Sequence, residues 1–384
     1  MVKDTTLVWA VIAMVIAISF YLQKFKALKL VGPSIICILF GIILGNTGIM
    51  PHMHPVYITI MTYTIPISLS MFMLNMNIKE IFSLSKEPLL AVLLALISVC
   101  GVAFIASFLF HGKIPELYKF TGMFIGTYTG GSANLTAVGI ALGATASQFA
   151  TANGADYITG MPVLISFFIL PGIILRSDLG RKIFPYSLTK EELHSEEDGE
   201  LFGDKQWSVT DLAMLFGIAL LLTVLSNYIS TFFPKQLTAA IKIITITTLS
   251  IILGQFKGVQ KIKGNTEVGI YVSAFFLVVI GFLVDIPQFI SSVPFIAVYC
   301  ATIILGATTI YIILCRIFKI KYQYAIIAFV AMIADGSSAA IISASNKWKS
   351  LVQVAILLGT IGGVAGNYLG IGLALLVQKL TTGG

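Results

Sequence analysis

Residues 126–136, with the sequence GTYTGGSANLT, interrupt a long apolar segment of this chain. Two adjacent glycines, Gly130 and Gly131, stand here between hydroxyl and amide side chains. Glycine loses much backbone entropy in a helix, and Ser, Thr and Asn side chains compete for backbone hydrogen bonds, so we predict a broken helix. Lipid cannot satisfy the freed N–H and C=O groups, so the break must be buried in protein or line a wet cavity. The stretch is therefore a candidate binding site.

A second stretch of the same character lies at residues 334–340, with the sequence ADGSSAA. It places Asp335 before Gly336, as the first stretch places Gly130 before Gly131. We therefore expect a second broken helix in the other half of the chain.

The composition is that of a polytopic membrane protein. Of 384 residues, 57% are hydrophobic and only 11% charged, and the mean hydropathy is +0.96. The net charge of +7 needs no nucleic-acid partner, because short basic clusters beside apolar spans are what membrane topology requires. The four cysteines form no CxxC pair, so neither a disulfide framework nor a thiolate metal site is indicated.

Twelve apolar segments are predicted to be helical, six on each side of a hydrophilic linker. They lie at about 6–22, 31–45, 55–77, 89–110, 119–143, 155–175, 209–230, 237–254, 266–285, 294–318, 322–346 and 351–378. The first resembles a signal peptide, but its lysines follow the apolar run instead of preceding it, so we expect it to be retained. The acidic residues of the linker are interpreted as a solvated charge run.

The two halves are related in sequence. The tetrapeptide IILG ends both the second and the eighth segment, and Gly-Ser occurs in both breaks. Such matches in register indicate an internal duplication. We predict a first transmembrane repeat at 1–175, a linker at 176–208 and a second repeat at 209–384.

The positions of lysine and arginine predict the orientation of the two repeats. Basic clusters in short loops are cytoplasmic as a rule, but twelve full crossings would put the first basic loop and the linker on opposite sides. The conflict disappears if each broken segment is a re-entrant hairpin, so that two inverted repeats cross five times each. An unrecognised extra crossing, or one basic loop on the wrong side of the membrane, would also resolve it. We expect a multi-pass protein of a prokaryotic plasma (inner) membrane, with a cytoplasmic linker.

The broken segments supply the candidate solute site. Helix N-termini at a break carry unpaired N–H groups and a partial positive charge that suit a carboxylate. The alternative is a packing interface of small residues. The candidate solute-binding residues are Thr127, Thr129, Gly130, Gly131, Ser132, Asn134, Gly336, Ser337, Ser338 and Asn367.

Carboxylates within apolar segments are the candidates for coupling to a cation, because such groups are expensive in a membrane. Asp335 is interpreted as a ligand of Na⁺ or a proton carrier, or as a helix cap, two roles that are compatible. Asp156 follows Asn153 by one helical turn and is either a second cation ligand or an interfacial helix acid. Thr136 completes this set. We predict no cofactor and no metal other than Na⁺.

These residues predict a secondary transporter and not an enzyme. No GxxxxGK[ST] motif for ATP occurs in the chain. The predicted function is cation-coupled symport of a small anionic organic solute by alternating access. The alternatives are a Na⁺/H⁺ antiporter, a passive channel and, more distantly, an intramembrane aspartyl protease using Asp156 and Asp335.

The run TGGSAN at 129–134, with Asp156 downstream and DGSS at 335–338, resembles the YjcL-like family of uncharacterised bacterial integral-membrane proteins. That family is grouped with the cation:proton antiporter and anion transporter superfamily. The resemblance implies a scaffold plus a core with discontinuous helices, an elevator movement and a homodimer. The organisation is also similar to that of sodium:glutamate and 2-hydroxycarboxylate symporters. Antiporters of the superfamily carry adjacent acid pairs, whereas Asn153 and Asp156 here are separated by two residues.

Overall fold

A computed structural model of the chain describes residues 4–25, 32–51, 54–74, 76–193, 207–283 and 286–382. Within these ranges every regular element is a helix, which confirms the all-α prediction. The acidic residues of the linker at positions 196–204 lie outside the described residues.

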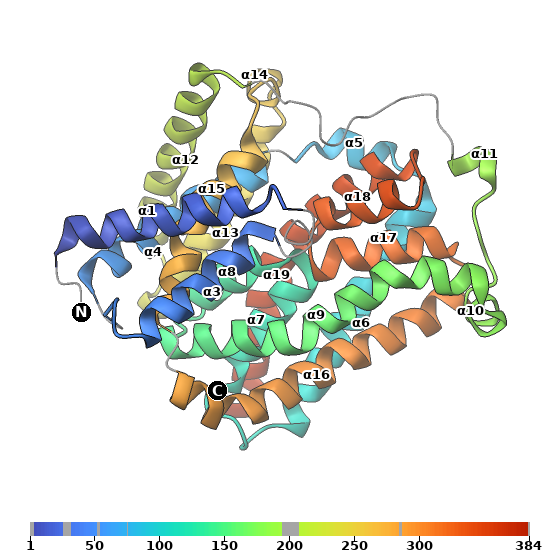
Figure 1. Ribbon diagram of the computed structural model, residues 1–384, viewed down its shortest axis with the longest axis horizontal. Helices are drawn as coiled ribbons and strands as arrows, with labels where there is room; N and C mark the ends of the chain where they lie inside the picture. Colours follow the sequence, from blue (N-terminus) through green and yellow to red (C-terminus); the bar gives the residue numbers. More distant parts are fainter. Residues whose placement is uncertain are drawn as a thin grey trace. The chain divides into compact units, whose positions relative to one another are not determined.

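The helices follow the predicted segments in order (Figure 1). Before the linker they are α1 (Thr5–Leu22), α3 (Gly32–Asn46), α4 (Pro55–Leu74), α5 (Ile78–Ser83), α6 (Lys86–Leu109), α7 (Leu117–Gly130), α8 (Ser132–Ala141) and α9 (Ala146–Arg176). The linker contains α10 (Asp178–Ile183) and α11 (Lys190–Leu193). After it come α12 (Val209–Ser230), the 3-10 helix η1 (Lys235–Leu237), α13 (Thr238–Gly254), α14 (Lys257–Gln260), α15 (Asn265–Phe282), α16 (Ile286–Ile317), α17 (Tyr322–Ile333), α18 (Gly336–Ser345) and α19 (Leu351–Thr382).

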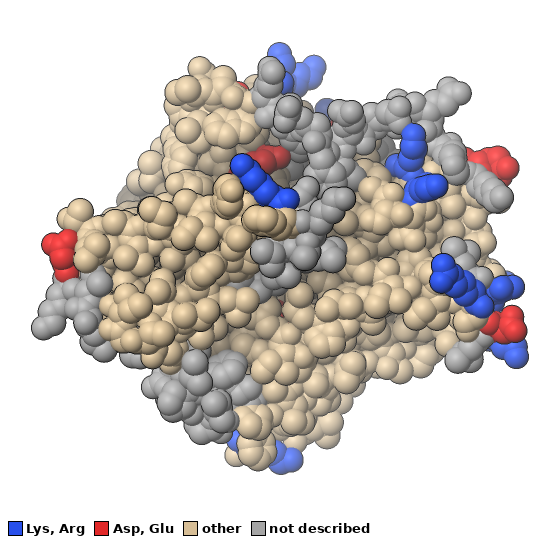
Figure 2. Space-filling model, viewed as in Figure 1, with Lys and Arg blue, Asp and Glu red and all other residues tan. Residues whose placement is uncertain are grey.

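The described helices are those of a multi-pass membrane protein. Eight of them, α1, α4, α6, α9, α12, α15, α16 and α19, are long and apolar enough to span a membrane. Figure 2 shows the corresponding surface, with a broad uncharged area and most of the visible lysine and arginine at its margins. Such a surface suits lipid, because charged side chains are costly within the hydrocarbon region.

Two helices begin earlier than hydropathy predicts: α9 begins at Ala146 instead of about 155, and α16 at Ile286 instead of about 294. At α9 the cause is a capping box. The backbone N–H of Gln148 donates to Thr145 Oγ1 (3.3 Å), and the N–H of Thr145 donates to Gln148 Oε1 (2.9 Å). These polar side chains start the helix while they lower the local hydropathy.

The chain folds into two compact units, each built from both halves of the sequence. The first comprises Met1–Asn75, Gly143–Gly154 and Gln206–Pro294, and the second Met76–Leu142, Ala155–Lys205 and Phe295–Gly384. This division into compact units cuts across the predicted repeats at 1–175 and 209–384. The repeats are predicted from matches between the sequences of the two halves, and they stay a prediction.

The first unit is held together by apolar packing between α4, α12 and α15. Its core includes Ile67, Met71, Leu215, Leu222 and Val272. Helices α3 and α15 approach closely where two glycines face each other, because a Cβ at Gly41 would lie 2.8 Å from the Cα of Gly281. Small residues permit such approaches of membrane helices, where dispersion between well-packed atoms replaces the hydrophobic effect.

Candidate functional site

The first broken segment is a helical hairpin within the second unit. Helix α7 ends at Gly130, and Gly131, with a φ of 81°, is both the C-cap of α7 and the N-cap of α8. A Cβ at Gly126 would lie 3.0 Å from the Asn134 carbonyl oxygen, and one at Gly122 would lie 2.5 Å from the Leu142 side chain. Residues before the break thus face residues after it in reverse order. The two helices therefore run back along each other, as the re-entrant hypothesis requires.

The second broken segment has the same form. Helix α17 ends at Ile333 with Ala334 as its C-cap, and α18 begins after Asp335, which is its N-cap. The start of α17 lies beside the end of the segment, because the rings of Tyr322 and Trp348 are 5.9 Å apart between centroids. Figure 1 shows α17 and α18 side by side. The segment is therefore a second hairpin with its break at the tip.

The tips of the two hairpins meet. A Cβ at Gly131 would collide with the carbonyl oxygen of Ala334. Gly131 needs its left-handed φ for the turn and has no room for a side chain, so only glycine meets both requirements. The two breaks found in the sequence are thus brought together in one unit.

Helix α19 runs along both hairpins and shows that they approach from opposite ends. Its first residues follow Trp348 at the base of the second hairpin, and a Cβ at Gly359 would collide with the backbone of Gly336 near that hairpin's tip. Further along, a Cβ at Gly370 would lie 2.9 Å from the carbonyl oxygen of Gly122, well down the first hairpin. The 20 or so residues between the two bases span ~30 Å of helix, which is about the thickness of the hydrocarbon core. The two tips therefore meet near the middle of this length.

Two of the predicted solute residues make hydrogen bonds near the tip of the first hairpin, and one of these bonds reaches α19. Asn134 Nδ2 donates to the carbonyl oxygen of Gly363 on α19 (2.6 Å). The hydroxyl of Thr129 donates within its own helix to the Ile125 carbonyl oxygen (2.7 Å). Both residues are buried. Both residues are thus part of the helix packing, which is the alternative role that the sequence left open for this stretch.

Replacing Asn134 with alanine removes the side-chain hydrogen bond that joins α8 to the Gly363 carbonyl oxygen of α19. We expect the free energy of unfolding to fall by about 1 kcal/mol, the net value of such a bond. The matched control is Asn346→Ala, because Asn346 Nδ2 donates to the Ile342 carbonyl oxygen, which also accepts the Asn346 backbone N–H. Thermal unfolding in one detergent compares the two variants, and equal melting temperatures would show that the Asn134 bond contributes nothing.

Asp335 caps the second hairpin's returning helix. Its Oδ1 accepts the backbone N–H of Ser338 (2.6 Å), and its Oδ2 accepts the Ser338 hydroxyl (3.2 Å). The carboxylate is exposed, and Gly336 follows it against the Ile356 carbonyl oxygen of α19. The capping role is thus seen directly, and exposure leaves the carboxylate accessible to a cation. The side chains of Ser132 and Ser337 lie outside the described part of the structure.

Asp156 lies in a different polar group, buried among α7, α9 and α16. The residue is 8% exposed, and its Oδ2 accepts the Thr127 hydroxyl (3.3 Å). Gly160 makes room beside it, because a Cβ there would lie 2.7 Å from Asp156 Oδ1 and 3.3 Å from the Tyr128 hydroxyl. A buried carboxylate surrounded by hydroxyl donors is suited to hold a proton or a small cation.

Two neighbours of Asp156, Thr159 and Cys300, were missed as site residues, while Tyr128 was expected only as one of the polar side chains of the broken stretch. The Tyr128 hydroxyl lies 2.9 Å from Cys300 Sγ, and the Thr159 hydroxyl donates to the same sulfur (3.1 Å). Thr159 could have been found from its spacing of one turn after Asp156. From the sequence, Cys300 is interpreted only as a small buried hydrophobic residue. It is buried, but no signal in the sequence predicts its polar contacts.

Three candidates remain: Asn153, Thr136 and Asn367. Asn153 belongs to the part of α9 assigned to the first unit, where its Nδ2 donates to the Phe149 carbonyl oxygen (2.8 Å). Its Oδ1 is buried and has no hydrogen-bond partner among the described residues. Thr136 in α8 and Asn367 in α19 are fully buried. Across the described ranges, no group of three His, Cys, Asp or Glu side chains is placed to hold a metal ion.

Comparison with known proteins gives a family without an assigned activity. The sequence model of a family described as "Protein of unknown function (DUF819)" matches residues 10–380. A similar curated protein is "Uncharacterized membrane protein YjcL" of Bacillus subtilis (strain 168), which is 26% identical over 386 residues. The similarity covers 96% of this chain and 95% of that protein.

Proposed function

The chain belongs to the DUF819 family, and we propose that it is a secondary active transporter that couples Na⁺ or H⁺ to a small anionic organic solute. The observation that carries the proposal is the meeting of two hairpin tips, at Gly131 and at Ala334. Irregular backbone at membrane depth is tolerated where it is buried in protein or lines a cavity. Broken helices near the middle of the membrane form the substrate and ion sites of many secondary transporters.

At the tips, helix N-termini with a partial positive charge and helix C-termini with a partial negative charge come together. Helices α8 and α18 begin there, and α7 and α17 end there. The N-terminal ends favour a carboxylate of the solute, while the C-terminal carbonyl groups and the exposed Asp335 carboxylate favour a cation. Joint binding of an anion and a cation would neutralise each charge with the other, which is the physical basis of symport in this proposal.

The buried Asp156 is proposed as the second coupling residue. Its carboxylate has hydroxyl partners and no ion-pair partner among the described residues. An unneutralised buried carboxylate is costly unless it gains a proton or a cation. Asp156 alone would also serve a Na⁺/H⁺ antiporter, so this alternative is kept. The intramembrane aspartyl protease stays the more distant alternative, with Asp335 bonded to Ser338 and Asp156 to Thr127.

The orientation and assembly follow by inference. The base of the second hairpin is flanked by Arg316, Lys319, Lys321, Lys347 and Lys349. The positive-inside rule then puts this base and the linker in the cytoplasm. An elevator movement and a homodimer are implied by the family resemblance and stay predictions.

A screen of ligands on the purified protein tests the proposal. Thermal unfolding is followed with carboxylates, amino acids and small peptides, with and without Na⁺ and at two pH values. A solute at a hundred times its Kd should stabilise the protein by about 2.7 kcal/mol, and the gain should depend on Na⁺ or pH. Asp335→Asn keeps a capping side chain, so it should fold and lose part of the cation dependence. The control is Asp178→Asn, at the start of linker helix α10. Symport would be refuted if the solute stabilised the protein equally with and without Na⁺ and at both pH values.

A further inference from the structure

Linker residues 186–193, here called the strap, lie across the base of the second hairpin. The first backbone N–H of α17, that of Tyr322, donates to the Tyr186 carbonyl oxygen (2.9 Å). The N–H of Leu188 donates to Oε1 of Gln323 (3.0 Å), a side chain only 1% exposed. A helix N-terminus leaves its first N–H groups without partners in the helix, and a buried amide also needs one. The strap supplies both, so it is part of the fold of the second unit.

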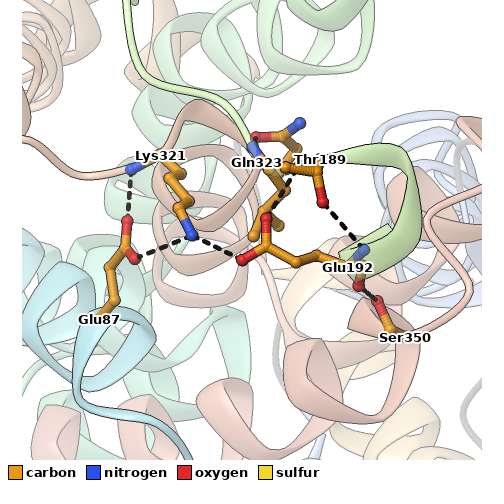
Figure 3. Close-up of polar contacts among 7 residues, drawn as sticks. Glu87, Thr189, Glu192, Lys321, Gln323 and Ser350 are labelled. Atoms are coloured by element: carbon orange, nitrogen blue, oxygen red, sulfur yellow. Dashed lines mark hydrogen bonds and ion pairs between the residues drawn. The ribbon is translucent and has the colours of Figure 1, made fainter. Parts of the chain in front are cut away.

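A charged clasp joins the strap to α6 and to the start of α17 (Figure 3). Lys321 Nζ lies 2.9 Å from Glu192 Oε1 of the strap and 3.9 Å from Glu87 Oε2 of α6. The Lys321 backbone N–H donates to Glu87 Oε1 (2.6 Å), and the Thr189 N–H donates to Glu192 Oε2 (2.7 Å). The clasp thus holds three segments that are far apart in the sequence.

The clasp is charged throughout the neutral range. Two hydrogen bonds lower the pKa of Glu192 below its ordinary value of 4.5. The larger effect comes from the Thr189 N–H and the smaller from Lys321. The hydrogen bond to Glu192 raises the pKa of Lys321 above 10.5. A lowered carboxyl pKa stabilises the docked strap above pH 4.5, and this contribution is lost as the pH falls through the folded value. A raised lysine pKa stabilises it below pH 10.5, and that contribution is lost as the pH rises further.

The strap also forms hydrogen bonds with the turn that follows α18, at the C-terminal end of the hairpin. The hydroxyl of Ser350, just before α19, donates to the Glu192 carbonyl oxygen (2.7 Å), and its N–H donates to the Leu193 carbonyl oxygen (3.4 Å). Figure 3 shows Ser350 and Lys321 reaching Glu192 from different sides. One short segment therefore fastens both the first helix of the hairpin and the turn that follows its second helix.

The tip of the same hairpin is held by close packing of its backbone, because a Cβ at Gly336 would lie 2.8 Å from the Ile356 carbonyl oxygen of α19. Among the described residues, the side-chain hydrogen bonds found at the tip are the local ones from Ser338 to Asp335. The first hairpin differs, because Asn134 bonds its tip to α19. A tip held mainly by packing can leave that packing if the hairpin tilts about its base, so fixing the base holds the tip in place.

We propose that the strap is a conformational brake, which holds the base of the second hairpin and thereby keeps its tip closed on Gly131. Releasing the clasp loosens the base and lets the tip around Asp335 open. The strap lies in the linker, so a binding or modification event on the linker would act on the tip through Glu192 and Ser350. The brake acts on the motion of this one hairpin and does not depend on whether the protein transports the solute proposed above.

Hydrogen exchange measured by mass spectrometry on the purified full chain tests the brake. The test variant is Glu192→Gln, which removes the clasp charge, and the control is Asp178→Asn, on the same linker. We expect exchange at residues 334–345 to rise several-fold in Glu192→Gln, and to stay at the wild-type level in the control. Residues 122–142 of the first hairpin serve as an internal reference and should be unchanged.

A second measurement needs no variant. Raising choline chloride from about 0.1 M to about 1 M shortens the Debye length from about 10 Å to about 3 Å and weakens an exposed ion pair without adding Na⁺. Exchange at residues 334–345 of the wild type should rise. The brake is overturned if the strap residues 186–193 exchange faster in either experiment while the tip does not. It is equally overturned if neither segment changes.

Discussion

Replacing Gly131 with alanine is expected to drive the two hairpin tips apart and to lower the free energy of unfolding by about 2 kcal/mol or more. Gly131 has a φ of 81° and a ψ of 178°, a conformation that is essentially confined to glycine and costs another residue about 1–3 kcal/mol. The new methyl group would also collide with the carbonyl oxygen of Ala334, a backbone atom that cannot rotate away. The solute-dependent stabilisation should be lost as well, because the tips form the proposed site.

Two control variants separate these causes. Gly143 has a φ of 63° but open space around it, so Gly143→Ala should show only the conformational cost. Gly372 lies in α19 with nothing within 4 Å, so Gly372→Ala should be neutral or slightly stabilising, as alanine favours a helix. Melting temperatures in one detergent rank the three. If Gly131→Ala is no less stable than Gly143→Ala, the tips do not meet as described.

Replacing Asp156 with asparagine should have opposite effects on stability and on function. The carboxylate is 8% exposed, and its described neighbours carry no positive charge to compensate it. Removing its charge at nearly constant shape should leave the protein as stable or raise its stability by on the order of 1 kcal/mol. The dependence of solute binding on Na⁺ or pH should disappear. Thermal titrations with the solute at two Na⁺ concentrations and two pH values measure both effects.

The contrasting control is Asp211→Ala at the start of α12. Asp211 closes a capping box with Ser208 and is exposed, so its loss should lower stability by about 0.5–1 kcal/mol without touching the cation dependence. If Asp156→Asn were as destabilising as this control and kept the cation dependence, Asp156 would be a structural residue.

The breaks were predictable because local chemistry causes them. Two glycines with hydroxyl neighbours end α7, and Asp335 before Gly336 is a capping signal that begins α18. Local rules also predict that each segment breaks, but not what touches the break. The contacts of Gly131 with Ala334 and of Asn134 with Gly363 join residues about 200 positions apart, which no period or cap determines.

The same limit explains the polar groups that the sequence did not reveal. Cys300 joins the Asp156 group through Tyr128 and Thr159, and a buried thiol in a span has no sequence signature apart from its apolar surroundings. The acidic linker was interpreted as a solvated run, yet Glu192 pairs with Lys321 across 129 positions. Charge composition identifies a polar segment, but only folding gives it partners.

Solute accumulation in proteoliposomes tests the central claim most directly. The solute identified by the ligand screen is supplied in labelled form, and a Na⁺ gradient or a pH gradient is imposed across the membrane. The account predicts accumulation above the external concentration that collapses when an ionophore dissipates the gradient, and none in Asp156→Asn. Simple equilibration of the solute in the wild type, regardless of either gradient, would contradict it.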